Sequence, residues 1–117
     1  MTVNYVRWLR SYVGHQRLLQ MAASAFIRDK AGRVLLGRRS DVMLWAPPSG
    51  VIQLGETPAK TLVREVHEET GYRVQPGRPL GNIRYLKESR GAPREKIVHF
   101  WAMRLRSRRC ETTRLRV

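Results

Sequence analysis

The stretch WAPPSGVIQLGETPAKTLVREVHEETGYRV, from Trp45 to Val74, decides the fold, because it combines a well-bounded helix with an unusual concentration of acid. Four of the nine acidic residues of the chain lie between Glu56 and Glu69, although the formal net charge of the whole chain is +14. Acid gathered locally in so basic a protein indicates a specific task for this segment.

The second half of the stretch predicts one helix. Thr57 can cap the free backbone amides at the start of a helix, and Pro58 fits the first helical turn. Apolar residues then recur at helical spacing, and Gly71 is the expected end, because glycine readily adopts the left-handed conformation that terminates helices. We therefore expect a helix from about residue 58 to residue 70.

Three glutamates of this helix share one side. Glu65, Glu68 and Glu69 stand at i, i+3 and i+4, a spacing at which like charges cost a few tenths of a kcal/mol per pair. A divalent cation would turn this cost into binding energy, and sites made of carboxylate oxygens suit Mg²⁺ or Mn²⁺. The alternative is a solvated acidic side with an Arg64–Glu68 ion pair, which the three glutamates by themselves favour.

The longer pattern Gly-x5-Glu-x7-Arg-Glu-(Ile/Leu/Val)-x-Glu-Glu-x-Gly-hydrophobic resembles the Nudix box, the signature of the Nudix hydrolases. Tyr72 stands where an aliphatic residue is usual, and Ser49 stands where a second glycine is common. The resemblance covers about residues 20–106. Nine specified positions over 23 residues keep the spacing of the box: Gly50, Glu56, Arg64, Glu65, Val66, Glu68, Glu69, Gly71 and Tyr72.

The resemblance implies an α/β (α+β) fold, in which a mixed sheet lies in an α/β/α sandwich. We expect an N-terminal amphipathic helix and linker at residues 1–19, a Nudix hydrolase domain at 20–106 and a basic tail at 107–117. The closing strand and helix usual in the family are not recognisable in the tail, which is either truncated or divergent. A sheet without them would expose an edge and an apolar face, which favours a homodimer.

The resemblance also implies a reaction. Nudix hydrolases cleave, with a divalent metal, the pyrophosphate bond of a nucleoside diphosphate linked to a group X. Here X would complete a nucleoside triphosphate, ADP-ribose or a sugar nucleotide, or a dinucleoside polyphosphate. Carried over by position, the metal ligands are the Gly50 carbonyl, Glu65, Glu68 and Glu69, with Glu56 either supporting the loop or reaching a second metal.

Roles in catalysis follow from the same positions. Glu68 and Glu69 form the central acidic pair, Arg64 orients the carboxylates, and Glu69 is our first choice as catalytic base. Glu88 and Glu95, on a later loop, are the alternatives.

Substrate contacts are expected before the box. Arg38 and Arg39 end a strand at which Nudix proteins often contact phosphates, and solvated arginines are an equal alternative. Trp45 is a candidate for stacking on the substrate, although packing in the core or a loop is the more common use of such a residue.

Composition limits the remaining possibilities. A chain of 117 residues suffices for one domain, and the single Cys110 forms no internal disulfide, which suits a cytoplasmic setting. We expect neither a membrane span nor a signal peptide. A pI near 11.5 suggests attraction to polyanions, although we favour a general surface property over a nucleic-acid site. The charge suggests removal of pyrophosphate from RNA 5′ ends as an alternative function. The closing elements that are not recognisable leave a catalytically silent nucleotide-binding domain as a second alternative.

The rest of the chain predicts short elements. Hydrophobic residues at helical spacing predict an amphipathic helix at 3–14, which would pack on the domain or serve as a dimer arm or a lid. His99 is interpreted as a hydrogen-bonded core or cleft histidine. The expected strands are 21–28, 33–38, 51–52, a strand starting at 72–74, 80–86 and a central strand at 97–105, with a hairpin turn at 29–32, a loop at 40–44, a turn at 76–79 and a loop at 87–96.

Overall fold

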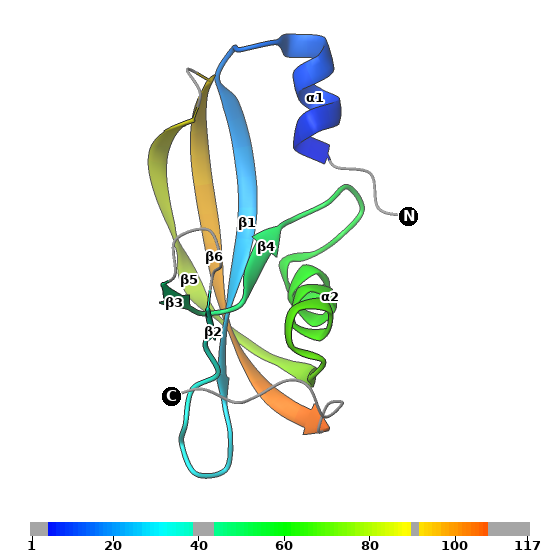
Figure 1. The fold of residues 1–117 in the computed structure, drawn as a ribbon, viewed down its shortest axis with the longest axis vertical. Helices are drawn as coiled ribbons and strands as arrows, with labels where there is room; N and C mark the ends of the chain where they lie inside the picture. Colours follow the sequence, from blue (N-terminus) through cyan, green and yellow to red (C-terminus); the bar gives the residue numbers. More distant parts are fainter. Residues whose placement is uncertain (1–4, 39–43, 90–91, 108–117) are drawn as a thin grey trace.

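The computed structural model describes residues 5–38, 44–89 and 92–107. Within these ranges, no helix is long and apolar enough to span a membrane. Figure 1 shows a mixed sheet with helix α2 against it and helix α1 beside its upper end. The elements in chain order are α1 (Tyr5–Val13), β1 (Leu18–Arg28), β2 (Gly37–Arg38), β3 (Trp45–Ala46), β4 (Ser49–Val51), α2 (Pro58–Thr70), β5 (Arg73–Ser89) and β6 (Ala92–Ser107).

Helix α2 is the predicted helix, and both of its ends are capped as expected. The Thr57 hydroxyl accepts a hydrogen bond from the Lys60 N–H at 3.2 Å, and Pro58 occupies the first turn. Gly71 ends the helix at φ 77°, and its N–H donates to the His67 carbonyl at 2.8 Å. A side chain at this left-handed φ would be strained, so glycine suits the position.

The main sheet has the strand order β4-β1-β6-β5. Strand β1 runs antiparallel to β4 and parallel to β6, and β6 runs antiparallel to β5. One row across the sheet joins Gly50 of β4 to Ala23 of β1, His99 of β6 and Asn82 of β5. The strands β2 and β3 form a separate two-stranded sheet.

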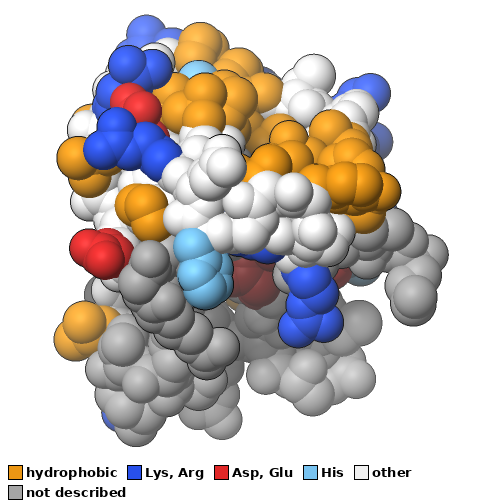
Figure 2. All heavy atoms as spheres, turned by 90° about the horizontal axis from the view of Figure 1, so that it is seen from above, with side chains coloured by type: hydrophobic (Ala, Val, Ile, Leu, Met, Phe, Trp, Pro, Cys, Tyr) orange, Lys and Arg blue, Asp and Glu red, His pale blue; other side chains and the backbone are white. Residues whose placement is uncertain are grey.

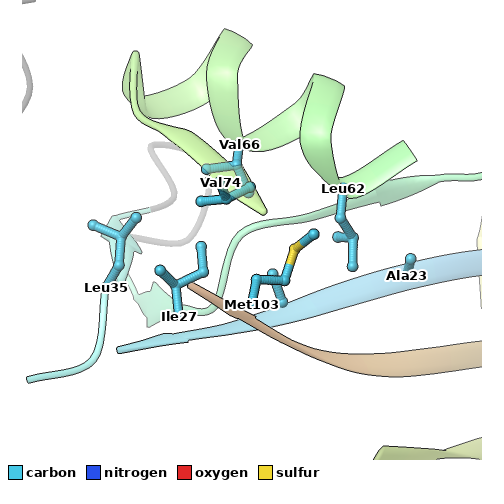
Figure 3. Packing of buried hydrophobic residues seen from close by; sticks show 8 residues of the cluster. Ala23, Ile27, Leu35, Leu62, Val66, Val74 and Met103 are labelled. Atoms are coloured by element: carbon cyan, nitrogen blue, oxygen red, sulfur yellow. The ribbon is translucent and has the colours of Figure 1, made fainter. Parts of the chain in front are cut away.

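The core lies between α2 and the part of the sheet that this helix covers. Leu62 and Val66 of α2 are fully buried, and Figure 3 shows their side chains directed toward β1 and β6. Small residues on β1, such as Ala23, let the helix approach closely. The core cluster comprises Ala23, Ala25, Ile27, Leu35, Leu62, Val66, Val74 and Met103.

The α+β class with a mixed sheet is confirmed. In the described ranges, α2 is the only helix with extensive contacts to the sheet, so the second helical layer of the expected sandwich is not seen there. The sheet face opposite α2 carries large apolar side chains that are partly open to solvent. They include Phe26, Ile83 and Tyr85, whose exposed fractions are 40, 52 and 39%.

The predicted turn at 76–79 and most of the predicted loop at 87–96 are wrong. Strand β5 is continuous from Arg73 to Ser89, with register shifts between Pro76 and Gly81, and β6 already begins at Ala92. The prolines fit because β5 is an edge strand, on which a missing N–H breaks no ladder on the open side and bulges are tolerated.

The predicted return strand at 33–38 is largely absent. A single bridge joins Arg28 to Val34, the Leu35 N–H donates to the Ile27 carbonyl at 3.0 Å, and only Gly37–Arg38 forms a strand. The reason is that β4 pairs with β1 at residues 22–24, which leaves only the far end of β1 for the returning chain.

Candidate active site: an arginine that gathers the box carboxylates

Arg64 is the centre of the site. From the middle of α2, its guanidinium donates two parallel hydrogen bonds to Glu56, from Nε to Oε2 at 2.7 Å and from Nη2 to Oε1 at 2.9 Å. Such bidentate contacts are among the strongest ion pairs in proteins. The pairing raises the pKa of Arg64 above its usual range. The guanidinium therefore stays charged and fixed in place.

Glu56 has its carboxylate fully engaged. Besides Arg64, its Oε1 accepts hydrogen bonds from the Gln53 N–H at 3.1 Å and from the Thr61 hydroxyl at 2.9 Å. The hydrogen bonds from Arg64 lower the pKa of Glu56 most, and those from Gln53 and Thr61 add to the effect, so that the pKa falls to about 2 despite partial burial. Glu56 thus ties the loop before α2 to the helix itself.

Two further carboxylates approach the same guanidinium. Arg64 Nη1 lies 2.8 Å from Glu65 Oε1 and 3.6 Å from Glu68 Oε2. The Glu65 side chain is 20% exposed and the Glu68 side chain 56%. Glu65 is therefore held against the protein, while Glu68 extends toward solvent.

Gly50 gives Glu65 its place. A Cβ atom built on Gly50 would lie 2.5 Å from Glu65 Cδ and 2.7 Å from its Oε1. Real Cβ atoms essentially never approach other atoms so closely. Only the absence of a side chain at Gly50 lets the Glu65 carboxylate lie against the backbone of β4. The site thus joins the backbone of an edge strand to the acidic side of α2.

The donor set has the chemistry of a hard-cation site. Glu65, packed against Gly50, and Glu68, one helical turn further along α2, offer carboxylate oxygens, and Mg²⁺ and Mn²⁺ prefer such ligands. In the described part of the chain, no three His, Cys, Asp or Glu side chains converge closely enough to hold a metal as they stand. The carboxylates are gathered by Arg64 instead.

The remaining predicted residues lie in several places. Glu69 is exposed on α2. Glu88 lies near the end of β5, and Glu95 lies on β6, where its Oε1 is 3.0 Å from Arg84 Nε. Both belong to the β5–β6 hairpin rather than to the predicted loop.

The predicted substrate contacts lie on the small sheet. Arg38 pairs with Trp45 across β2 and β3, and both side chains are exposed. Arg39 lies outside the described residues. The role of these residues toward a substrate stays a prediction.

Sequence reasoning missed two residues that hold Glu56. They are Gln53 and Thr61, whose contacts with Glu56 form only when the loop folds onto α2. His99, on β6, is a separate case: its buried Nε2 has no hydrogen-bond partner in the described ranges, and neither has Trp101 Nε1. The interpretation of His99 as a hydrogen-bonded histidine is therefore wrong for this nitrogen.

Comparison with known proteins decides the family. The family model described as the NUDIX domain matches residues 18–113. The chain belongs to the Nudix family. Nudix family members are pyrophosphohydrolases that generally use divalent metal ions, and relatives of this chain carry names such as RNA pyrophosphohydrolase.

Curated Nudix relatives match over part of their length. The chain is 43% identical over 79 residues to a candidate mutator protein, MutT4, of Mycobacterium tuberculosis, which covers 66% of this chain and 32% of that protein. It is 52% identical over 53 residues to a MutT-like protein of Streptomyces ambofaciens (45% and 34%) and 43% identical over 47 residues to an RNA pyrophosphohydrolase of Francisella tularensis (40% and 30%). The chain thus spans about a third of the length of these relatives.

Solved Nudix structures share the fold. A MutT protein from Bacillus halodurans matches with a TM-score of 0.65 and 22% identity, over 80% of this chain and 62% of that one. A MutT protein from Methanosarcina mazei Go1 matches with a TM-score of 0.58 and 27% identity, over 81% and 75%. The arrangement of α2 against a mixed sheet is therefore that of the family.

Proposed function

We propose that this chain is a metal-dependent pyrophosphohydrolase, which cleaves the pyrophosphate bond of a nucleoside diphosphate linked to X. The observation that carries the proposal is the cluster around Arg64, where Glu56, Glu65 and Glu68 meet and Glu65 packs against the bare backbone of Gly50. A cluster that served only to stabilise the helix would not need Glu65 packed against a glycine. We propose a nucleoside triphosphate, ADP-ribose or a sugar nucleotide, or a dinucleoside polyphosphate as substrate, acting in the cytoplasm.

The proposed residue roles are those of the corresponding positions of the box. Glu65, Glu68 and Glu69, with the Gly50 carbonyl, would hold Mg²⁺ or Mn²⁺. When bound, such an ion neutralises phosphate charge and activates water. Glu56 has its oxygens occupied by Arg64, Gln53 and Thr61, which supports the structural role expected for it over contact with a second metal.

Arg64 acts as a positioning residue. Its two hydrogen bonds to Glu56 fix the guanidinium, and its third nitrogen then restrains Glu65 and approaches Glu68. We assign proton abstraction to Glu69, which is exposed on the same side of α2. Glu88 and Glu95 remain the alternatives, but their position on the β5–β6 hairpin places them on a different element.

Contacts to the rest of the substrate are assigned to the small sheet. Arg38 and Trp45 pair across β2 and β3, so a phosphate contact and an aromatic surface lie next to each other. Arg39 would extend this contact.

The test is product release from a panel of nucleotides, measured with Mg²⁺ and with Mn²⁺. The panel contains nucleoside triphosphates, ADP-ribose, nucleotide sugars, dinucleoside polyphosphates and 5′-triphosphorylated RNA. We expect turnover of at least one class and its loss in Glu68→Gln. A folded wild-type protein without turnover on any class would refute the hydrolase and leave the catalytically silent nucleotide-binding domain.

Alanine substitutions at two separate glycines test the proposed position of Glu65. Gly50→Ala must displace Glu65, because the new Cβ would overlap its side chain, and we expect turnover to fall by roughly a hundredfold, since misplacing a catalytic group by about an ångström has that effect. Gly37→Ala is the matched control, because its Cβ would meet nothing closer than 3.9 Å. Equal activity in the two variants would contradict the proposed position of Glu65.

RNA 5′-pyrophosphohydrolase activity is the second candidate. The net charge of +14 favours a polyanionic substrate, and relatives named RNA pyrophosphohydrolases match part of the chain. Release of pyrophosphate from triphosphorylated RNA in preference to mononucleotides would establish it.

A further inference from the structure

Helix α1 carries a row of three aromatic rings, of which the last two are exposed. The rings of Tyr5 and Trp8 are stacked, with centroids 6.1 Å apart and an angle of 28° between them, and Tyr12 meets Trp8 edge-on at 5.4 Å. The exposed fractions of Trp8 and Tyr12 are 45 and 75%. None of the residues of α1 is fully buried, so core packing does not explain why three aromatic residues stand at this spacing.

The helix is held in place at both ends. The Tyr5 N–H donates to Gln53 Oε1 at 3.2 Å. Arg10 donates to the carbonyls of Gly14 at 2.9 Å, Gln16 at 2.5 Å and Pro93 at 3.2 Å. Helix α1 therefore bridges the loop before α2 and the start of β6 as a fixed element.

The aromatic row begins next to the site. Gln53, which accepts from Tyr5, also donates through its backbone N–H to Glu56 at 3.1 Å. From Tyr5, the row runs along α1 for seven residues, which is about 10 Å. That length matches about three bases at the ~3.4 Å spacing of a nucleic-acid strand.

The charge around the row suits a polyanion. Residues 1–17 contain three arginines and neither Asp nor Glu. Arg7 on α1 and Arg17 in the linker that follows are both exposed. Figure 2 looks onto this end of the molecule and shows hydrophobic side chains gathered in patches, with Lys and Arg side chains, and acidic ones among them, at their borders.

We infer that the outer side of α1, formed by Tyr5, Trp8 and Tyr12 with the neighbouring arginines, binds single-stranded nucleic acid by stacking bases on the aromatic rings. Aromatic rings that accept bases, combined with positive charge along the backbone, are the common means of binding single strands without sequence preference. A duplex keeps its bases paired and cannot stack them on the helix. This surface extends the proposed function, because a strand lying along α1 would bring one end to the box. Binding at α1 is independent of that function, and only the cleavage of a bound strand rests on it.

The test measures binding separately from hydrolysis. A 3′-labelled RNA of about twelve nucleotides with a 5′-hydroxyl is titrated with the full chain, without added metal, and followed by fluorescence anisotropy. We expect the double variant Trp8→Ala/Tyr12→Ala to bind at least about tenfold more weakly than wild type, because two stacking platforms are lost. Trp8→Phe/Tyr12→Phe keeps the rings and should retain most of the affinity.

The controls distinguish stacking from general attraction. Tyr85→Ala removes an exposed aromatic ring from β5 and should bind as wild type does, and a duplex of the same length should bind more weakly than the single strand. Unchanged affinity in the alanine double variant, equal loss in Tyr85→Ala, or no RNA binding at all would each overturn the inference.

Two further measurements complete the test. Tighter binding to anionic phospholipid vesicles than to RNA, lost in the alanine double variant, would assign the surface to membranes and overturn the inference. RNA binding that depends on Trp8 and Tyr12, in a protein without turnover on the nucleotide panel, would uphold the surface and refute the hydrolase. The two proposals can therefore fail separately.

Discussion

The ion pair between Arg64 and Glu56 makes the site sensitive to acid. The pKa of Glu56 is lowered from 4.5 to about 2, first by the hydrogen bonds from Arg64. A carboxyl group whose pKa is lower in the folded protein stabilises the fold at pH values above its unfolded pKa, and this stabilisation is lost as the pH falls through the folded pKa. For Glu56, the loss occurs between about pH 4.5 and pH 2.

We therefore expect Glu56→Gln to reduce the free energy of unfolding at pH 7, on the order of 1 to 3 kcal/mol, and to flatten its decline in acid. The range allows for partial solvent screening of a side chain that is 20% exposed. Urea unfolding at pH 7, 4 and 3 measures both effects. Glu88→Gln, on the exposed end of β5, is the control. An identical decline in wild type and Glu56→Gln would show that the pair does not couple folding to pH.

At the residue scale, the sequence predicted a cluster of glutamates with Gly50 and Arg64, but not the hydrogen bonds within it. The box spacing indicated Gly50 and the glutamates, and the structure places Glu65 against Gly50 and Arg64 among the carboxylates. The use of both Glu56 oxygens could not be predicted, because Gln53 and Thr61 become its partners only when the loop folds onto α2. The orphaned His99 nitrogen depends in the same way on neighbours from other elements.

At the scale of elements, α2 holds the molecule together. Leu62 and Val66 are fully buried in the core, while Val63 next to Leu62 is 37% exposed. We expect Leu62→Ala to lower the free energy of unfolding by 2 to 5 kcal/mol (about the cost of a core cavity), and Val63→Ala to change it by less than about 1 kcal/mol. Thermal and denaturant unfolding of the two variants compare neighbouring residues with opposite environments. A loss of similar size in both would contradict the orientation of α2.

Elements with local signals were predicted well. Helix α2 was expected from 58 to 70 and spans Pro58–Thr70, because its caps and its apolar spacing lie within the segment itself. The strand predicted at 97–105 is β6, an interior strand as expected. The N-terminal helix was expected at 3–14 and is seen at Tyr5–Val13, with residues 1–4 outside the described ranges.

Elements that depend on distant partners were predicted poorly. Pro76, Gly77 and Pro79 carry every local signal of a turn, yet they lie in β5 because an edge position tolerates prolines and bulges. Likewise, the segment 33–38 follows a hairpin turn and predicts a return strand, but β4 pairs with the middle of β1. Such outcomes are set by which segment takes each position in the sheet, and single-sequence patterns do not contain that information.

At the scale of the whole molecule, net charge and exposed apolar surface have opposite effects on the association of two copies. The face opposite α2 presents Phe26, Ile83 and Tyr85, which favours the homodimer expected from the sequence, while a net charge of +14 keeps two copies apart. Salt screens the repulsion without weakening apolar contacts.

We therefore expect the average mass in solution, measured by sedimentation, to rise as NaCl increases from about 0.05 to about 0.5 M. Ile83→Ser should reduce the rise, whereas Leu54→Ser, at an exposed position before α2, should leave it unchanged. A mass that is independent of salt, or a rise of equal size in Ile83→Ser, would show that this face does not mediate association.

The parallel pairing of β1 with β6 has a consequence for how the chain folds during synthesis. β1 pairs along its whole length, Leu18 with Arg94 through Arg28 with Arg104, with a strand that is made some 76 residues later. Topologies dominated by such distant contacts fold slowly. Until β6 emerges, the alanine-rich β1 lacks its longest neighbour and α2 lacks part of the surface that it covers. The nascent protein would then be the form most exposed to aggregation and to chaperones.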